Sequence, residues 1–161
     1  MIDFFGSLFA RGTPTLAEAG HRDAGAIAAL HAASFRRGWS EQEVEQLLID
    51  RQVIAHRATV GSKLTGFIMS RRAADEAEIL SVAIAKSHRG RGLGRELLTL
   101  HLRRLAALGT RAVFLEVDET NTPAIRLYDR AGFRGVGRRP HYYPTADGKP
   151  AAALVFRRDL A

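Results

Sequence analysis

Apolar residues at helical spacing alternate along this chain with stretches at strand spacing. Asp23 can cap a first helix on which Ile27 and Phe35 fall near one face. Ser40 followed by Glu43 matches a capping box, and this pair predicts the start of a second helix. The N-terminal part of the chain is therefore predicted to carry two helices, after a short strand at residues 15–19.

Two further helices are predicted in the second half of the chain. Leucines recur at helical spacing between residues 97 and 108, and Gly109 follows where a C-terminal cap belongs. Asn121 can cap the next helix, with Pro123 near its first position, and that helix should stop at Gly132. Each of these helices lies between two stretches of strand-like alternation.

The remaining apolar stretches are predicted to be strands. A glycine turn joins residues 53–60 to residues 64–71, which predicts a hairpin. A helix separates residues 77–84 from residues 112–118, and this predicts a parallel pair, because parallel strands need a crossover connection. The last strands are expected at residues 133–137 and 152–157. The chain is therefore predicted to be an α/β (α+β) protein with a mixed sheet.

Length and composition limit the kind of protein and the kind of site. With 161 residues, the chain is long enough for one domain, which we place at residues 13–161 after an N-terminal tail at residues 1–12. That tail is too short to span a bilayer and has Asp3 where a secretory signal carries positive charge. The absence of cysteine excludes a disulfide framework, a thiolate zinc site and a cysteine nucleophile, and it favours the cytoplasm. The net charge of +7, mostly from arginine, predicts an anionic partner.

A glycine loop between the strand at residues 77–84 and the following helix predicts a phosphate-binding site. Gly90, Gly92 and Gly94 allow a tight turn that brings backbone N–H groups close to an anion, and the helix N-terminus adds partial positive charge. Neighbouring arginines supply counter-charge: Arg89, Arg91 and Arg95. The spacing disfavours a dinucleotide, because Arg95 stands where that fingerprint requires glycine. A triphosphate-binding loop is excluded, because no Gly-Lys-Ser or Gly-Lys-Thr ends the motif.

Glu116 is a carboxylate inside an otherwise apolar predicted strand. Burial makes a carboxylate a better proton acceptor, which suits a general base. The alternative is that Glu116 faces an open sheet surface or pairs with an arginine. Tyr128, on the following helix, is a candidate acid, although a tyrosine at this position also suits simple packing. Together the two side chains predict a cleft beside the glycine loop.

These features combine in a known pattern. The motif Arg/Gln-x-x-Gly-x-Gly/Ala is matched by Arg89-Gly90-Arg91-Gly92-Leu93-Gly94. The sequence resembles the GNAT family of acetyl-CoA-dependent N-acetyltransferases, and most closely the RimI type, the ribosomal-protein-alanine N-acetyltransferases. The resemblance covers residues 15–158. It rests on further segments at residues 77–84, 114–117, 121–133 and 141–148.

The resemblance implies a GNAT fold, with a mixed six- to seven-stranded sheet, helices on both faces and a V-shaped opening between the two central parallel strands. It implies acetyl-CoA as cosubstrate and no metal. Glu116 then corresponds to the general base, with Glu78 or Glu76 in reserve, and Tyr128 corresponds to the acid that protonates the departing CoA thiolate. The implied cofactor contacts are Val82, Ala83, Ile84, Arg89, Gly90, Arg91, Gly92, Leu93, Gly94, Arg95 and Asn121.

The acceptor is predicted to be the α-amine of a protein N-terminus, such as the N-terminal alanine of a small-subunit ribosomal protein. Deprotonation at pH 7 costs an α-amine about 1.4 kcal/mol and a lysine about 4.6 kcal/mol, so a lone carboxylate suits the α-amine better. Trp39, Tyr142 and Tyr143 are candidates for the wall of the acceptor groove. Residues 149–152 lack the acidic pair that the family often has there, in the region that would line the peptide groove.

Other functions remain compatible with the sequence. The same motifs support acetylation of a protein lysine or of a small amine such as a polyamine or an antibiotic. The arginine content alone is also compatible with a non-enzymatic RNA-binding module, although no RNA-binding aromatic signature accompanies it. Neither a stable nucleic-acid complex nor a membrane attachment is predicted, and the sequence leaves the oligomeric state open.

Overall fold

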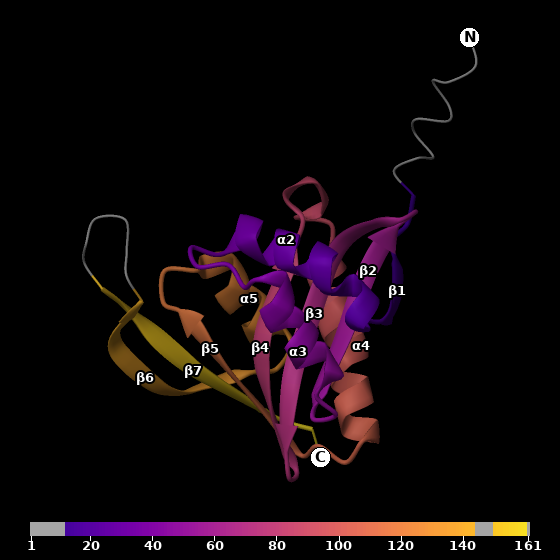
Figure 1. Cartoon of the computed structure of the whole chain (residues 1–161). Coiled ribbons are helices and arrows are strands. Elements are labelled where there is room, and N and C mark those ends of the chain that lie inside the picture. Colours follow the sequence, from indigo (N-terminus) through magenta and orange to yellow (C-terminus); the bar gives the residue numbers. More distant parts are fainter. Residues whose placement is uncertain (1–11, 144–149, 161) are drawn as a thin grey trace.

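The computed structural model describes residues 12–143 and 150–160, which form one mixed sheet with helices on both faces (Figure 1). The strands are β1 (Thr15–Glu18), β2 (Val53–Val60), β3 (Lys63–Ala73), β4 (Glu76–Ile84), β5 (Ala112–Asp118), β6 (Arg134–Tyr143) and β7 (Ala151–Asp159). The helices are α2 (Ala24–Ser34), α3 (Glu41–Ile49), α4 (Leu93–Ala107) and α5 (Thr122–Arg130), with the short 3₁₀ turns η1 (His21–Asp23) and η2 (Lys86–His88). Apart from Gly12, the expected N-terminal tail lies outside the described residues.

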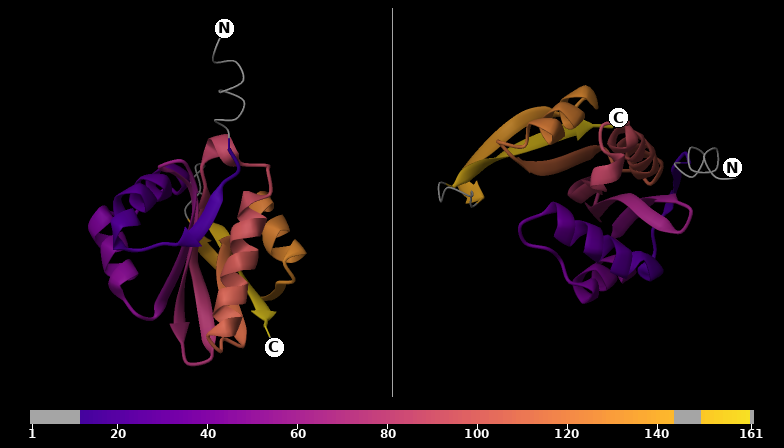
Figure 2. Two further views of the ribbon diagram at one scale, coloured as in Figure 1. Left: turned by 90° about the vertical axis from the view of Figure 1, so that its right-hand side faces the viewer. Right: turned by 90° about the horizontal axis from the view of Figure 1, so that it is seen from above.

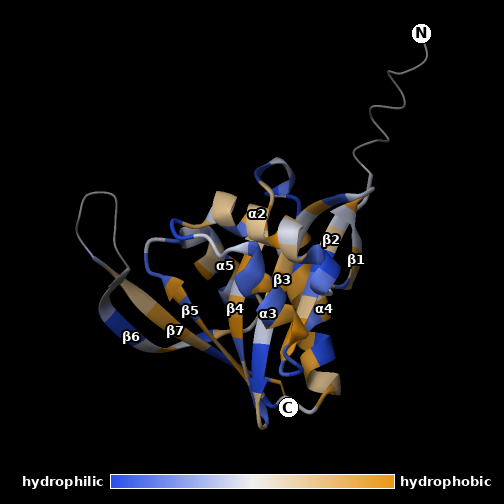
Figure 3. Ribbon diagram, in the orientation of Figure 1, coloured by the Kyte–Doolittle hydropathy of each residue, from blue (hydrophilic) through white to orange (hydrophobic). Residues whose placement is uncertain are grey.

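The sheet lies between two helical layers (Figure 2). Helices α2 and α3 pack on one face, over a cluster that contains Ile27 and Phe67. Helices α4 and α5 pack on the other face, over a cluster that contains Leu97, Leu115 and Tyr128. The strands between the layers are largely hydrophobic, whereas β6 at the edge is largely hydrophilic (Figure 3). Burial of apolar surface on both faces of the central strands therefore holds the layers together.

Strands β4 and β5 are parallel neighbours in a seven-stranded sheet of order β1-β2-β3-β4-β5-β7-β6. They pair only where residues 76–79 lie beside residues 112–115. Beyond this point, β4 continues along β3 to Ile84, while β5 continues along β7 to Asp118. The two central strands therefore diverge, and the expected V-shaped opening is confirmed.

A register irregularity in β4 falls where the divergence begins. Met69 of β3 pairs with Ser81, but the next residue, Ser70, pairs with Ile79, so Leu80 is an extra residue in β4. A bulge of this kind bends a strand and shifts the alternation of its side chains. The bulge accounts for the direction in which β4 leaves β5.

The locally encoded elements are confirmed. The Ser40 hydroxyl accepts the Glu43 N–H at 3.1 Å, and the Glu43 carboxylate accepts the Ser40 N–H at 2.9 Å, which completes the predicted capping box. The Asn121 side chain caps α5, with Pro123 in the first turn of the helix. Gly109 follows α4 with φ of 91°, as expected of a glycine that ends a helix.

Three local expectations are wrong. Phe35 does not share a helical face with Ile27, because α2 ends at Ser34, and Phe35 is extended and 39% exposed. Asp23 precedes α2 but makes no side-chain cap there, since its carboxylate accepts the Gly20 N–H at 2.9 Å and pairs with Arg57. Strand β6 extends past residue 137 to residue 143, because cross-strand pairing with β7 continues to residue 151.

Candidate active site

Glu116 lies on β5 at the rim of the opening between β4 and β5. Its neighbours Leu115 and Val117 are buried in the cluster beneath α4 and α5. Because side chains alternate along a strand, Glu116 points to the opposite face, and its side chain is 20% exposed. The Arg139 guanidinium on β6 lies 3.0 Å from Glu116 Oε1. The pairing with an arginine that the sequence allowed is therefore present.

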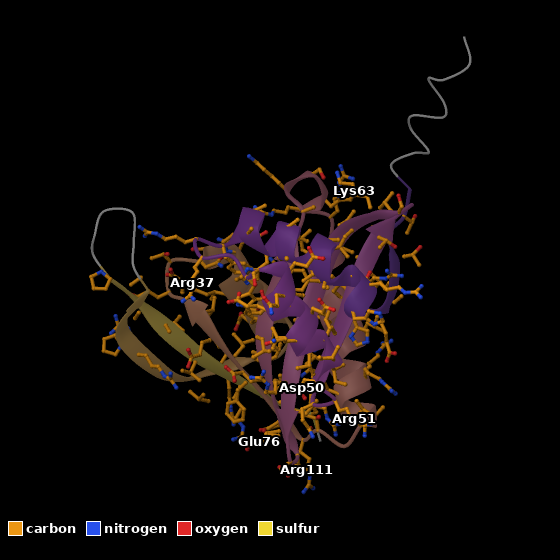
Figure 4. All side chains as sticks on the ribbon, in the orientation of Figure 1. Arg37, Asp50, Arg51, Lys63, Glu76 and Arg111 are labelled. Atoms are coloured by element: carbon orange, nitrogen blue, oxygen red, sulfur yellow. The ribbon has the colours of Figure 1, made fainter. Side chains whose placement is uncertain are left out.

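Glu116 lines an open cleft of about 360 Å³ on this face of the sheet. The cleft also contains Glu76 and Glu78 from β4, so the predicted base and both reserve carboxylates lie together. Arg71 and Arg139 are the cations of the same cleft. Glu76 lies near the lower end of the sheet in Figure 4. Such a set of carboxylates can hold an ammonium group and accept a proton from it.

Tyr128 lies on α5 and belongs to the cluster beneath α4 and α5. It is 7% exposed, and its ring meets the Phe133 ring edge-on at 5.6 Å between centroids. Burial raises the pKa of Tyr128 to about 12, so the phenol stays protonated at neutral pH and can only donate a proton. The sheet separates Tyr128 from Glu116. The two side chains approach the opening from opposite faces, rather than sharing one cleft on one face.

The glycine loop has the backbone geometry of an anion cradle. Gly90 and Gly92 have φ of 75° and 81°, which glycine adopts without strain, and Gly92 is the N-cap of α4. Among the described residues, Glu96 is the first residue of this turn whose N–H finds a backbone acceptor, the Gly92 carbonyl at 3.0 Å. Gly94 is different, because it lies inside the first turn of α4 with an ordinary helical backbone. Two of the three predicted glycines therefore form the turn.

The arginines of this loop have different roles in the structure. Arg89 Nε donates to the Ile84 carbonyl oxygen at 2.9 Å, so this side chain ties the loop to the end of β4. Arg91 and Arg95 are exposed and take no part in the ion pairs of the described residues. They remain available to an anion bound at the helix N-terminus.

The end of β4 presents an unpaired backbone edge toward the opening. Val82, Ala83 and Ile84 pair with β3 on one side, but the β4–β5 ladder stops at Ile79. An added Cβ on Gly94 would lie 3.6 Å from Leu127 and 3.7 Å from Ile84, so this edge, α4 and α5 converge. An extended chain can bond to such an edge through its own backbone polar groups.

Asn121 is the N-cap of α5, and Trp39 lies in the loop before α3. The Asn121 Oδ1 accepts the Ala124 N–H at 3.3 Å, which leaves the side-chain NH₂ group to face solvent or a ligand. Trp39 lines a second hollow of about 570 Å³ beside α3. The two hollows share Arg71, a residue that the sequence did not single out. The side chains of Tyr142 and Tyr143 lie outside the described residues.

Two cations of the site, Arg71 and Arg139, were missed from the sequence. Each stands among several arginines in its segment, and no local pattern marks which one faces Glu116. Only the strand order places them. Within residues 12–143 and 150–160, no group of three or more His, Asp or Glu side chains could hold a metal ion.

No helix in the described part of the chain is long and apolar enough to cross a membrane.

The family model of the acetyltransferase (GNAT) family matches residues 25–133, which include β4, the glycine loop, Glu116 and Tyr128. The chain belongs to the GNAT family. It is 32% identical over 117 residues to the ribosomal protein bS18-alanine N-acetyltransferase of Escherichia coli K12, a match that covers 73% of this chain and 78% of that protein. With this fold and this relative, this GNAT protein is an acetyl-CoA-dependent N-acetyltransferase.

Solved structures of the family have the same architecture. The crystal structure of the ribosomal-protein-S18-alanine N-acetyltransferase from Escherichia coli gives a TM-score of 0.86 at 26% identity, covering 92% of this chain and 95% of that chain. The crystal structure of Arabidopsis thaliana NAA60 in complex with acetyl-CoA gives a TM-score of 0.80 at 20% identity. This match covers 91% of this chain and 98% of that chain. The seven-stranded GNAT fold of this enzyme is therefore shared with both.

Proposed function

We propose that this enzyme acetylates the α-amine of a protein N-terminus, and that its acceptor is the N-terminal alanine of a small-subunit ribosomal protein in the cytoplasm. The observation that carries the proposal is the Glu116 cleft at the rim of the β4–β5 opening. The similarity to a bS18-alanine N-acetyltransferase supports this acceptor.

The proposed cofactor site uses the glycine loop and the open edge of β4. The N–H groups at residues 90–95 and the exposed Arg91 and Arg95 would hold the pyrophosphate, because a helix N-terminus and arginine both favour phosphate oxygens. The backbone of Val82, Ala83 and Ile84 would bond to the pantetheine arm. Asn121 would contribute its free NH₂ group.

Proton transfer would divide between the two faces of the opening. Acetyl-CoA supplies an acetyl group activated as a thioester. Glu116 removes a proton from the acceptor ammonium, directly or through water, and the amine nitrogen then forms the new bond to the acetyl carbon. As the carbon–sulfur bond breaks, the Tyr128 phenol would protonate the CoA sulfur. The new amide nitrogen would release its second proton to solvent, and solvent would return a proton to the Tyr128 phenolate. With its pKa raised by burial to about 12, the Tyr128 phenol is fully protonated at neutral pH, so the proton is present for this step.

The shape and the energetics both favour a polypeptide acceptor. The hollows of about 360 and 570 Å³ share Arg71, so a chain whose amine lies at Glu116 can continue toward Trp39. An α-amine costs about 1.4 kcal/mol to deprotonate at pH 7, against about 4.6 kcal/mol for lysine. A lone carboxylate is adequate for the first of these.

The proposal is tested by comparing acceptors of different kinds in a steady-state acetylation assay. We expect octapeptides that begin with alanine to be acetylated at the α-amine, as mapped by mass spectrometry. The same peptides with a blocked N-terminus and one internal lysine, and spermidine, should react at least ten-fold more slowly. Faster reaction of lysine or spermidine would overturn the proposed acceptor.

A further inference from the structure

The loop between α2 and α3, residues 35–40, is attached to α2 by one buried imidazole. His31 is 5% exposed, and its Nδ1 accepts the Trp39 backbone N–H at 3.0 Å. The same imidazole stacks on the Trp39 indole, with ring centroids 4.1 Å apart and planes 9° apart. The His31 imidazole therefore contacts both the backbone and the side chain of Trp39.

The loop has little freedom elsewhere. At Gly38, an added Cβ would lie 2.8 Å from both Cα and Cβ of Ala32, so the loop passes directly over α2 and only glycine fits. At the far end of the loop, the capping box of Ser40 and Glu43 fixes the start of α3. Three features thus fix the loop: the close approach of Gly38 to Ala32, the contacts of His31 with Trp39, and the capping box of Ser40 and Glu43.

Trp39, the residue that His31 holds, lines a hollow next to the Glu116 cleft. Arg37 and Trp39 line this hollow together with residues of α3, and Arg71 links it to the cleft. Arg37 lies above Glu76 in Figure 4, on the loop that His31 secures. The loop therefore forms one wall of the hollow next to the Glu116 cleft.

We propose that His31 is a positioning residue for the acceptor: it holds Trp39 as the wall against which acceptor residues beyond the first one lie. This inference rests on the proposed polypeptide acceptor. It assigns to His31 an effect on acceptor length, which a purely structural residue would not have.

The chemistry of the imidazole fits this role. Nδ1 can accept the Trp39 N–H only when it carries no proton, so His31 must be neutral with its proton on Nε2. Burial lowers the pKa of His31, and the Glu43 carboxylate on α3 opposes this effect in part. The aromatic neighbours, Phe35 on the loop and Phe67 on β3, carry no charge.

Two substitutions separate the two contacts of His31. His31→Phe keeps a ring against Trp39 but removes the acceptor for its N–H, whereas His31→Asn can still accept that N–H. We expect His31→Phe to raise KM for an Ala-initiated octapeptide at least five-fold, with kcat and the KM for acetyl-CoA nearly unchanged. Alanine amide, which is too short to reach Trp39, should be unaffected. His31→Asn should restore most of the octapeptide KM.

The outcome is checked against a matched control and a second readout. His21→Phe changes an exposed histidine of η1 and should behave as wild type. Trp39 is the one tryptophan in the sequence, so acrylamide quenching of its fluorescence reports the loop even if no peptide is acetylated. We expect quenching to rise in His31→Phe and in Gly38→Ala. The role of His31 would be overturned if KM changed equally for the octapeptide and alanine amide. It would also be overturned if quenching were unchanged in folded variants. A wild-type enzyme inactive on peptides would overturn only the proposed acceptor.

Discussion

The Arg139 guanidinium reaches Glu116 across an intervening strand. Arg139 lies on β6 and Glu116 on β5, but β7 runs between them in the sheet, and the two side chains still meet at 3.0 Å. Strands β6 and β7 curve away from the central strands (Figure 2), and this curvature lets β6 face the cleft. The pair therefore joins the proposed base to the edge strand β6, which ends at the predicted acceptor residues Tyr142 and Tyr143.

Replacing Glu116 by glutamine removes the proposed proton acceptor and keeps the shape of the side chain. We expect kcat to fall about 100-fold, the order expected for loss of a general base, with the KM for acetyl-CoA nearly unchanged. Steady-state kinetics with an Ala-initiated peptide measures this, and Glu45→Gln on the exposed side of α3 is the control. If Glu116→Gln keeps wild-type rates and Glu78→Gln does not, the base is Glu78.

Replacing Arg139 by glutamine tests whether the ion pair orients the base. The pair is solvent-accessible, with Arg139 60% exposed, so its loss should lower kcat/KM by no more than about five-fold. If Arg139 acts by orienting Glu116, its substitution should have no further effect when Glu116 is already glutamine. Additive losses in the double variant would contradict a role of Arg139 through Glu116.

Replacing Tyr128 by phenylalanine removes the proposed acid with little change in packing. Among the described residues the Tyr128 hydroxyl has no hydrogen-bond partner, so the free energy of unfolding should change by less than about 1 kcal/mol. We expect kcat to fall at least ten-fold, since the CoA sulfur then leaves as an unprotonated thiolate. Calorimetry and steady-state rates measured together distinguish this from general damage; an unchanged kcat would remove Tyr128 from the mechanism.

Substitutions in the glycine loop should separate the turn from the helix. Gly92→Ala places a side chain at φ of 81°, which should cost about 1–2 kcal/mol and raise the KM for acetyl-CoA. Gly94→Ala leaves the backbone helical and meets only ordinary contacts, so stability should be retained or slightly improved. Thermal unfolding without ligand compares the two. Equal destabilisation would contradict the assignment of the turn to Gly90 and Gly92.

His101 on α4 lies in a buried polar chain whose contacts a neutral imidazole can satisfy. Its Nδ1 lies 2.7 Å from His56 Nδ1, and its Nε2 lies 2.6 Å from Ser70 Oγ. A neutral imidazole satisfies both contacts in either direction, because one ring nitrogen donates while the other accepts. Burial, with a smaller contribution from His56, lowers the pKa of His101 to about 3.

This pKa makes folding depend on pH in a defined window. The unfolded group titrates near 6.5 and the folded group near 3, so between these values the unfolded state binds the extra proton. The stability from His101 is complete above pH 6.5 and falls as the pH decreases, by up to about 1.4 kcal/mol per unit. Urea unfolding at pH 7, 6 and 5 should show a shallower decline in His101→Gln than in wild type or the exposed control His21→Gln. If the free energy of unfolding declined equally with pH in all three proteins, His101 would not be the source of the pH dependence.

The features predictable from the sequence are those that a few consecutive residues determine. The capping box at Ser40 and Glu43, the cap at Asn121 and the glycine turn each depend on backbone groups within about one helical turn. Glu116 was identified because a carboxylate interrupts an apolar strand. The motif at residues 89–94, together with the segments around it, was specific enough to indicate the family.

Features that depend on which strands become neighbours were beyond the sequence. The bulge at Leu80 opens β4 from β5, and the order β5-β7-β6 brings Arg139 to Glu116. Likewise, Tyr128 approaches the opening from the face opposite Glu116, because α5 packs on the same side as α4. Local spacing contains no information about these pairings, since they arise only when apolar burial selects one register among many.

The sequence by itself determined most of the elements, the glycine loop and the residue types proposed as acid and base. Only the tertiary structure decided how these residues are placed: which arginine pairs with Glu116, and that His31 holds Trp39. The physical reason is the separation in sequence of the residues that interact. Caps and turns depend on hydrogen bonds between residues a few positions apart, whereas the site depends on packing between strands and helices far apart in the chain.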